Sequence, residues 1–313
     1  MFSASKAAGA MINVFAEQET DFLDDEIIFK RFMLAFEAFK LWNKYSEDIQ
    51  DISGIDIGLK WGTHIVNSVN STFQEDLNFN YLENLINKKE PINFSNFMSK
   101  NSNIPEFLNT QNCYRSIRSL KVKDGWIESD KLLDALDTAI DRNGVKIIDD
   151  YAQALITEQN NIQVLTKNNK TSFKTKNLVI CNGSFMSNLI ATNKDSNSQI
   201  QKVFHGSGSA IEFQLNKNIE YDLKNLPQNV IRTLNRGNAC GLHIVPLSNN
   251  RFYLGATSTI HSAPEKSPRI ANLEFLTKNG INDFAPFIGK SNILEWRFGH
   301  RPVSSDTFPL LGK

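Results

Sequence analysis

The stretch from residue 130 to residue 183 constrains the fold more than any other part of the sequence. A helix is expected over residues 130–143, because leucines recur there on one face. Strands are expected at 145–148, 151–157, 162–166 and 172–173. A further strand is expected at residues 177–181, because residues 178–181 are continuously apolar, as in a parallel strand buried on both faces, and the strand ends at Asn182 and Gly183. This order predicts half of a doubly wound α/β nucleotide-binding domain.

The rest of the chain predicts a mixed α+β protein with a second domain. Residues 24–46 carry an aromatic stripe at helical spacing, which indicates a core-facing helix. Another helix is expected at 72–87, and residues 88–112 are expected to be mainly loops. Further elements are expected as strands at 57–61, 63–68, 202–214, 230–234, 241–247 and 251–255, and as a helix at 268–279. Their order favours an antiparallel sheet domain.

Composition limits the class of protein. A length of 313 residues suggests two domains or one large interrupted domain, and 41% hydrophobic and 22% charged residues are typical of a globular protein. Its 34 basic and 34 acidic residues balance, which argues against non-specific nucleic-acid binding. Membrane spans and a signal peptide are not expected. Cys113, Cys181 and Cys240 are odd in number and widely spaced, and they are interpreted as reduced core residues of a cytoplasmic protein. The histidines lack the spacing of a metal site.

Residues 295–312 contain the clearest candidate for a binding residue. An apolar strand precedes Gly299, and Pro302 and Pro309 fix the backbone, so the chain is expected to leave the sheet there as a stiff loop. A stiff loop would hold the guanidinium of Arg301 ready for a carboxylate or a phosphate. The alternative is an ordinary salt-bridged arginine on the surface.

Two other features have alternatives of the same kind. Residues 3–11 are mostly small, which lets the backbone approach a ligand or another backbone, unless they are a frayed terminus. His243 alternates with Leu242 and Ile244, so it is either a satisfied sheet histidine or a polar group that faces a pocket. The sequence contains neither G-x-G-x-x-G nor G-x-S-x-G, which leaves a dinucleotide fingerprint and a serine hydrolase without motif support.

Five segments in order resemble the glycine oxidase/D-amino-acid oxidase family of FAD-dependent oxidoreductases. They are residues 3–11, residues 124–127 (DGWI) with the helix that follows, residues 177–183, residues 241–246 with 253–257 (YLGAT), and residues 295–312 with their RPVSSDTFPLLG run. In that family a G-x-G-x-x-G turn would precede Ser3, and a last strand and helix would follow Lys313. The resemblance therefore implies an incomplete FAD-binding domain, formed by residues 1–50, 124–200 and 294–313, beside a substrate domain of residues 51–123 and 201–293.

The resemblance also implies a cofactor, a reaction and site residues. The cofactor would be FAD, and the reaction would oxidise the C–N bond of a small amino acid or secondary amine by hydride transfer to the flavin. Arg301 would pair with the substrate carboxylate, and His243 would line the substrate site. The residues expected to contact the cofactor are Ser5, Lys6, Ala7, Ala8, Gly9, Ala10, Met11, Gln153, Asn182, Gly183 and Gly299.

Two rival hypotheses remain beside this one. The chain could be a non-catalytic fragment of the same fold that binds a small molecule without a cofactor. It could also be a flavoenzyme that acts on tRNA, although the neutral charge and the lack of a basic stripe disfavour that reading.

Overall fold

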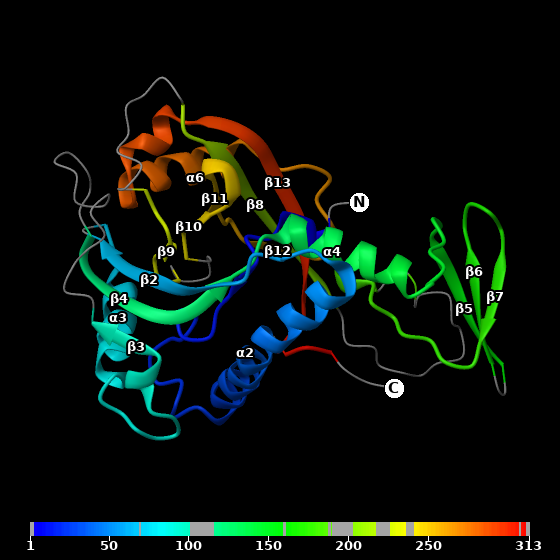
Figure 1. Ribbon diagram of the computed structural model, residues 1–313, viewed down its shortest axis with the longest axis horizontal. Helices are drawn as coiled ribbons and strands as arrows, with labels where there is room; N and C mark the ends of the chain where they lie inside the picture. The colour runs from blue at the N-terminus through cyan, green and yellow to red at the C-terminus, as the bar shows by residue number, and fades with distance from the viewer. Residues whose placement is uncertain are drawn as a thin grey trace.

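A ten-stranded mixed sheet forms the body of the protein, and a separate three-stranded sheet lies beside it (Figure 1). The computed structural model describes residues 3–68, 70–100, 116–158, 161–186, 189, 203–216, 226–235, 241–306 and 308–310. The large sheet has the order β1 (Met11–Ile12), β4 (Ser116–Trp126), β2 (Lys60–Ser68), β9 (Val230–Arg232), β10 (His243–Pro246), β11 (Arg251–Gly255), β8 (Phe204–Gln214) and β12 (Thr259–His261). In addition, β13 (Asn292–Val303) pairs with β8, and β3 (Met98–Lys100) pairs with β4.

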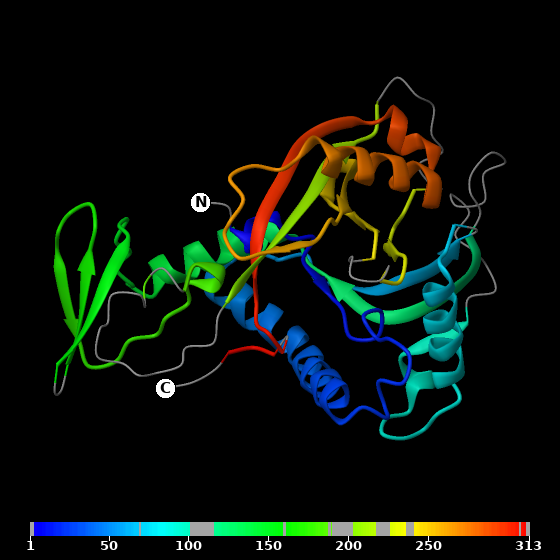
Figure 2. The same ribbon diagram turned by 180° about the vertical axis from the view of Figure 1, so that it is seen from behind.

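The helices lie around this sheet. They are α1 (Ala4–Ala7), α2 (Glu26–Ser53), α3 (Phe73–Leu85), α4 (Ser129–Arg142) and α6 (Ile270–Asp283), with 3-10 turns at Phe94–Asn96, Gly183–Phe185, Ser248–Asn250 and Pro286–Lys290. Figure 2 shows α6 against β8 and β11, where Leu276 is fully buried beside Leu254. Among the named strands, β2 and β9 pair in parallel and the other pairs are antiparallel. The fold is therefore mixed α/β, as expected.

The long helix α2 follows from its capping and its aromatic stripe. The Asp25 side chain accepts hydrogen bonds of 2.9 Å from the amides of Ile27 and Ile28, which begins the helix. Gly54 ends it in the left-handed conformation, with φ of 74°. Phe32 and Phe36 are buried in an aromatic core. The stripe prediction is confirmed, and the helix runs beyond residue 46 because no breaker comes before Gly54.

The expectation for residues 299–312 was wrong over its first part. β13 continues through Gly299 and Pro302 to Val303, and it pairs with β8 along its length apart from an irregularity at Leu294. An edge strand tolerates a proline, because the missing amide faces no second strand. Arg301 is consequently held by a strand ladder opposite Gly206 rather than by a loop.

Two other strand predictions were also wrong. Residues 145–148 and 177–181 form no strand, and Val145, Ile147 and Val179 are 56%, 67% and 83% exposed. Their apolar composition suggested burial, but no strand among the described residues pairs with them. Cys181 is likewise an exposed free cysteine rather than a core residue, and Cys113 and Cys240 lie outside the described residues.

The three-stranded sheet agrees with the prediction of a small antiparallel meander. It consists of β5 (Ala152–Glu158), β6 (Asn161–Thr166) and β7 (Ser172–Thr175). It lies away from the large sheet (Figure 1). The strand β4, in contrast, was not predicted. It pairs with β1, β2 and β3 and so connects these three N-terminal strands within the large sheet.

Candidate functional site

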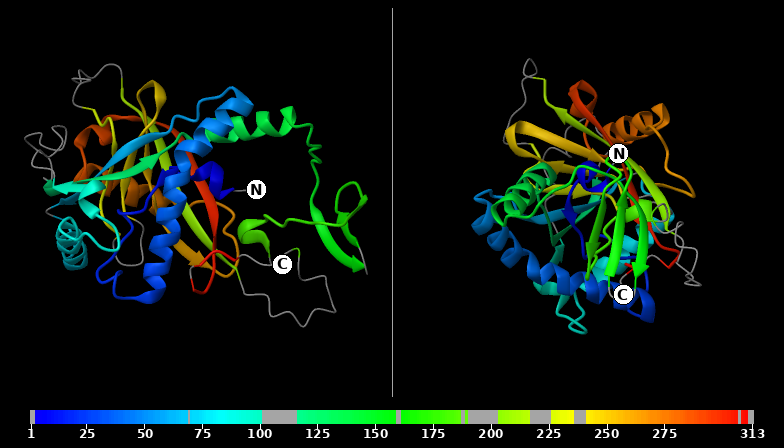
Figure 3. Two further views of the ribbon diagram at one scale, coloured as in Figure 1. Left: turned by 60° about the horizontal axis from the view of Figure 1, so that its bottom comes forward. Right: turned by 90° about the vertical axis from the view of Figure 1, so that its right-hand side faces the viewer.

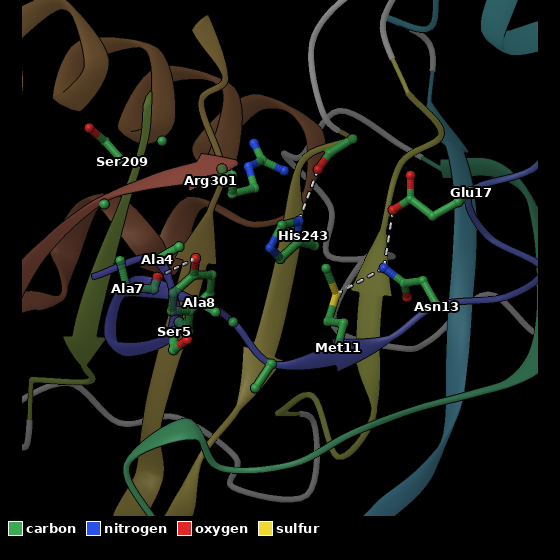
Figure 4. A pocket seen from close by; sticks show the side chains of 17 residues that line it. Ala4, Ser5, Ala7, Ala8, Met11, Asn13, Glu17, Ser209, His243 and Arg301 are labelled. Carbon is green, nitrogen blue, oxygen red and sulfur yellow. Dashed lines mark hydrogen bonds between the residues drawn. The ribbon is translucent and has the colours of Figure 1, made fainter. Parts of the chain in front are cut away.

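A cavity of about 410 Å³ opens where the N-terminal segment crosses the large sheet (Figure 4). Its walls come from α1 and the turn after it, and from β8, β10, β11 and β13. The lining residues are Ala4, Ser5, Ala7, Ala8, Gly9, Ala10, Met11, Asn13, Glu17, Gly208, Ser209, Gly241, His243, Tyr253, Ala256, Gly299 and Arg301. Small side chains form one end, Glu17 and Asn13 the other, and His243 and Arg301 lie between them.

The small residues are required by close approaches between segments. A Cβ atom on Gly299 would lie 2.8 Å from the carbonyl oxygen of Ser3 and 3.0 Å from Cα of Ala4. A Cβ atom on Gly9 would lie 2.7 Å from the Tyr253 ring. The run of small residues therefore allows the backbone to approach another backbone, which was one of the two expected reasons, and the same run lines the cavity. Within the run, α1 forms a single helical turn.

Arg301 projects from β13 on the same face as Gly299, because the two residues are two positions apart in a strand. Its Nη2 donates a hydrogen bond of 2.9 Å to the Ser258 hydroxyl. Arg301 also lines a second cavity of about 580 Å³, together with Asn182 and Gly183. The guanidinium thus lies at the boundary between the two cavities.

His243 is a buried and neutral imidazole. Its Nδ1 lies 2.9 Å from the carbonyl oxygen of Gly241, and since a carbonyl can only accept, Nδ1 carries the proton. Nε2 therefore keeps a lone pair. The ring stacks on Tyr253 with centroids 5.7 Å apart. Burial lowers the pKa of His243 to about 4, and the charges of Arg232 and Arg301 act in the same direction.

Residues 2–313 match the family described as DAO, FAD dependent oxidoreductase. The chain belongs to this family. A comparison of the sequence with curated proteins found no match. The DAO family and its structural neighbours are FAD-dependent, so FAD is the cofactor of the family to which this chain belongs.

Solved structures share the fold. Glycine oxidase from Geobacillus kaustophilus matches with a TM-score of 0.77 and 19% identity, over 99% of this chain and 76% of that one. Iminodiacetate oxidase from Chelativorans sp. BNC1 matches with a TM-score of 0.72 and 15% identity, over 97% and 75%. L-proline dehydrogenase from P. horikoshii matches with a TM-score of 0.70 and 14% identity, over 99% and 75%.

The small residues that line the first cavity of this DAO-family protein fit the flat ring system of FAD. A flat aromatic ring system needs a wall without bulky side chains, and α1 with the turn after it provides one from Ala4 to Ala10. Gly208 and Gly299 continue that wall on the neighbouring strands β8 and β13. Ser5, Ala7, Ala8 and the adjacent backbone would hold that ring system.

The structure brings most of the predicted site residues together. The first cavity is lined by Ser5, Ala7, Ala8, Gly9, Ala10, Met11, His243, Gly299 and Arg301. Asn182 and Gly183 line only the second cavity, which shares Arg301 with the first. Lys6 lines neither cavity, and its carbonyl oxygen instead accepts a hydrogen bond of 3.4 Å from Arg297. Gln153 lies on β5, in the separate three-stranded sheet, and lines neither cavity.

Glu17 is a polar wall residue that the sequence analysis missed. Its carboxylate accepts hydrogen bonds from Arg232 (2.6 Å), Asn13 (3.1 Å) and Asn235 (3.1 Å). Burial opposes its charged form, but Arg232 and the hydrogen bonds outweigh burial and hold the pKa of Glu17 below its usual range. Arg232 is only 1% exposed, so Glu17 is the counter-ion of a buried charge as well as a wall of the cavity.

A buried carboxylate fixes the segment that carries Glu17. Asp124 accepts hydrogen bonds from the backbone amides of Val14, Phe15 and Ala16 at 2.8 to 3.2 Å. Burial raises the pKa of Asp124 to about 6, although these amides act against the rise. Asp124 belongs to the DGWI segment, for which no role of this carboxylate was predicted. Its role is to hold the turn that positions Asn13 and Glu17.

Within the described residues, no helix combines the length and the apolar character that a membrane span requires. The same residues contain no group of three or more His, Cys, Asp or Glu side chains placed to hold a metal ion.

Proposed function

We propose that this DAO-family protein oxidises the C–N bond of a small amino acid or secondary amine. The observation that supports the proposal is the position of Arg301 and His243 in one small cavity, opposite a wall of small residues. The cavity offers a cation and an unprotonated nitrogen together, which suits a substrate with a carboxylate and an amine. FAD, when bound, supplies the hydride acceptor for that reaction.

Arg301 is proposed to bind the substrate carboxylate. A guanidinium presents parallel N–H donors that match the two oxygens of a carboxylate. The bond from Nη2 to Ser258 restricts the side chain, so less rotational freedom is lost when the substrate binds. Binding through the carboxylate would fix the amine-bearing carbon relative to the small-residue wall.

His243 is proposed to orient the amine rather than to take its proton. With a pKa of about 4, its imidazole is a weak base at neutral pH. Its Nε2 lone pair can still accept a hydrogen bond from an N–H of the substrate. The bond between Nδ1 and Gly241 and the stacking on Tyr253 hold the ring in one orientation. This role requires a substrate amine that has at least one N–H.

The test is a comparison of matched substrates. The purified chain is incubated with FAD, freed from excess cofactor and examined for a bound flavin spectrum. Glycine, N-methylglycine, iminodiacetate and proline are then added without oxygen, alongside methylamine, dimethylamine and pyrrolidine, which lack the carboxylate. We expect the flavin to be reduced by one or more of the amino acids and much more slowly by its decarboxylated partner.

Two results would contradict the proposal in different ways. A chain that remains colourless after incubation with FAD, yet binds an amino acid in calorimetry, would favour a cofactor-free binding protein of this fold. A flavoprotein that is reduced equally by both members of every pair would remove the carboxylate role from Arg301.

A further inference from the structure

The outward face of α2 carries apolar side chains at heptad spacing. Its exposed large hydrophobic residues are Ile27 (60%), Leu34 (53%), Leu41 (66%), Tyr45 (39%) and Ile52 (43%). Together with the exposed Arg31, Ala38 and Asp48 they form a row in which the steps alternate between four and three residues. We call this row the α2 stripe. Steps of four and three are the spacing of the a and d positions through which two helices pack against each other.

The stripe lies away from the face of α2 that packs on its own chain. Phe32 and Phe36 are buried in the core, whereas every member of the stripe is exposed. Figure 3 (left) shows α2 at the front, where it descends steeply through the middle of the view. The guanidinium carbon of Arg31 lies 6.0 Å from the centre of the Phe308 ring, so one edge of the stripe touches the C-terminal segment. The remaining members are open to a partner in the described structure.

The stripe is symmetric about the middle of the helix. Counting outward from the centre, Ala38 is matched by Leu41, Leu34 by Tyr45, Arg31 by Asp48, and Ile27 by Ile52. A second copy of α2, packed antiparallel on a two-fold axis at this centre, would place each residue opposite its match. The contact would then be isologous, with the same patch used by both copies.

The charges agree with this antiparallel register. Arg31 would lie opposite the partner's Asp48, and by symmetry the contact occurs twice. Exposed charged residues also recur every seven positions beside the stripe, at Lys30, Glu37, Lys44 and Asp51. In the antiparallel dimer Lys30 would lie near the partner's Asp51, and Glu37 near the partner's Lys44. A parallel pair in register would instead place Arg31 on the partner's Arg31 and Asp48 on the partner's Asp48, which is repulsive.

Ion pairs within the helix do not prevent this arrangement. Lys30 pairs with Glu26 at 2.5 Å and Lys44 with Asp48 at 2.6 Å. These pairs are solvent-exposed and contribute little stability, so they can rearrange or be shared when a partner binds.

We propose that the protein forms an antiparallel two-fold dimer through the α2 stripe, with Arg31 of each copy paired with the partner's Asp48. The apolar members supply the buried surface, and the charges select the antiparallel register. None of the stripe residues lines the candidate site, so this proposal stands independently of the proposed reaction.

Sedimentation velocity of the full chain tests the dimer. We expect a concentration-dependent dimer, and Leu34→Asp or Leu41→Asp should raise its dissociation constant by about a hundredfold or more, because each substitution occurs twice in the interface. Glu47→Lys, at an exposed position of α2 outside the stripe, is the matched control and should have no effect. Circular dichroism verifies that each variant is folded. A wild-type chain that is monomeric throughout the micromolar range would overturn the proposal.

Charge exchange tests the register. Arg31→Asp and Asp48→Arg should each weaken the dimer by about tenfold, because like charges then face each other at two places. The doubly exchanged chain, Arg31→Asp with Asp48→Arg, should recover most of the wild-type affinity. A double variant as weak as, or weaker than, the single variants would show that these residues do not face each other.

Cross-linking tests the orientation. Two single variants are prepared, Ile27→Cys and Ile52→Cys, and oxidised separately and as a mixture. The two positions are about 37 Å apart on one helix, so the antiparallel dimer gives a disulfide only in the mixture. The wild-type chain, with Cys113, Cys181 and Cys240, sets the background. Cross-links of each variant to itself, or none in the mixture, would overturn the proposed orientation.

Discussion

The carboxylate of Glu17 lies 2.6 Å from Nη1 of Arg232, a residue 215 positions further along the chain. The pair joins the N-terminal segment to β9 at the polar end of the cavity. Arg232 is buried in the sheet, and its guanidinium is compensated there by the Glu17 carboxylate and by hydrogen bonds to Thr233 and Asn235. The same two residues therefore affect both the stability of the fold and the shape of the site.

Removal of Glu17 should destabilise the protein. Glu17→Ala leaves the buried Arg232 without its carboxylate and should lower the free energy of unfolding by about 2 kcal/mol, less than for a fully buried pair because Glu17 is partly exposed. Glu17→Gln should cost less, because it retains acceptors. Urea denaturation measures the change, with Glu19→Ala at an exposed position as the control. Equal effects at positions 17 and 19 would contradict the role of the pair.

The stability should depend on pH through His243. In the unfolded chain this imidazole binds a proton below pH 6.5, whereas in the folded protein it does so only below about 4. The unfolded state therefore binds more protons at His243 between these values, so the His243 contribution to the free energy of unfolding should fall by about 3 kcal/mol as pH drops through that window. Asp124, whose pKa is raised to about 6, contributes with the opposite sign over much of the same window. His243→Gln should remove the His243 contribution, which urea titrations measure as the difference between the pH dependence of the variant and that of the wild type. A variant with the wild-type slope would show that His243 titrates normally.

Arg301 should control the affinity for the carboxylate. Arg301→Ala should raise KM for amino-acid substrates by about tenfold to a hundredfold, and Arg301→Lys should do so by less, because a lysine keeps the charge but loses the paired donors. Steady-state kinetics measures this effect, and Arg269→Ala is the control, since Arg269 pairs with Glu265. If KM for an amine without a carboxylate rises equally, Arg301 acts on the architecture of the site instead.

A methyl group at Gly299 should disturb the small-residue wall. Gly299→Ala places a Cβ atom against the backbone of Ser3 and Ala4, which cannot turn aside as a flexible side chain can. We expect a loss of about 1–3 kcal/mol in unfolding free energy and a weaker affinity for FAD. Thermal unfolding and flavin titration measure the two effects.

Gly144→Ala provides the comparison for that substitution. Gly144 has a positive φ of 66° but open space around its Cβ position, so its replacement introduces backbone strain without a clash. A decrease for Gly299→Ala no larger than that for Gly144→Ala, with unchanged flavin affinity, would contradict the steric argument.

The elements that could be predicted from the sequence are those with local signals. Thr72 caps the N-terminus of α3, because its side chain and that of Glu75 form reciprocal hydrogen bonds with each other's backbone, and a helix was expected there. β4 gave no comparable signal, because its place depends on pairing with three other strands. The residues at 177–181 show the opposite error, since apolar composition alone does not provide a partner strand.

The candidate site divides in the same way. Arg301, His243 and the small residues could be named because their segments carry recognisable patterns. Tyr253 belonged to one of those segments, but only the β10–β11 pairing and the approach of Gly9 show that its ring lies against His243. Glu17 had no pattern at all. Its place depends on the Asp124 bonds to the turn before it, which join residues more than a hundred positions apart.

Arg301 is a wall of both cavities, and this has a thermodynamic consequence. A ligand that draws the guanidinium toward one cavity changes the shape and the charge of the other. Occupancy of the two cavities is then energetically coupled, and by linkage each ligand must alter the affinity of the other by the same factor. Through the Arg301 side chain, an anion bound in the first cavity would therefore change the affinity of the second cavity for a ligand held between Asn182 and Phe308.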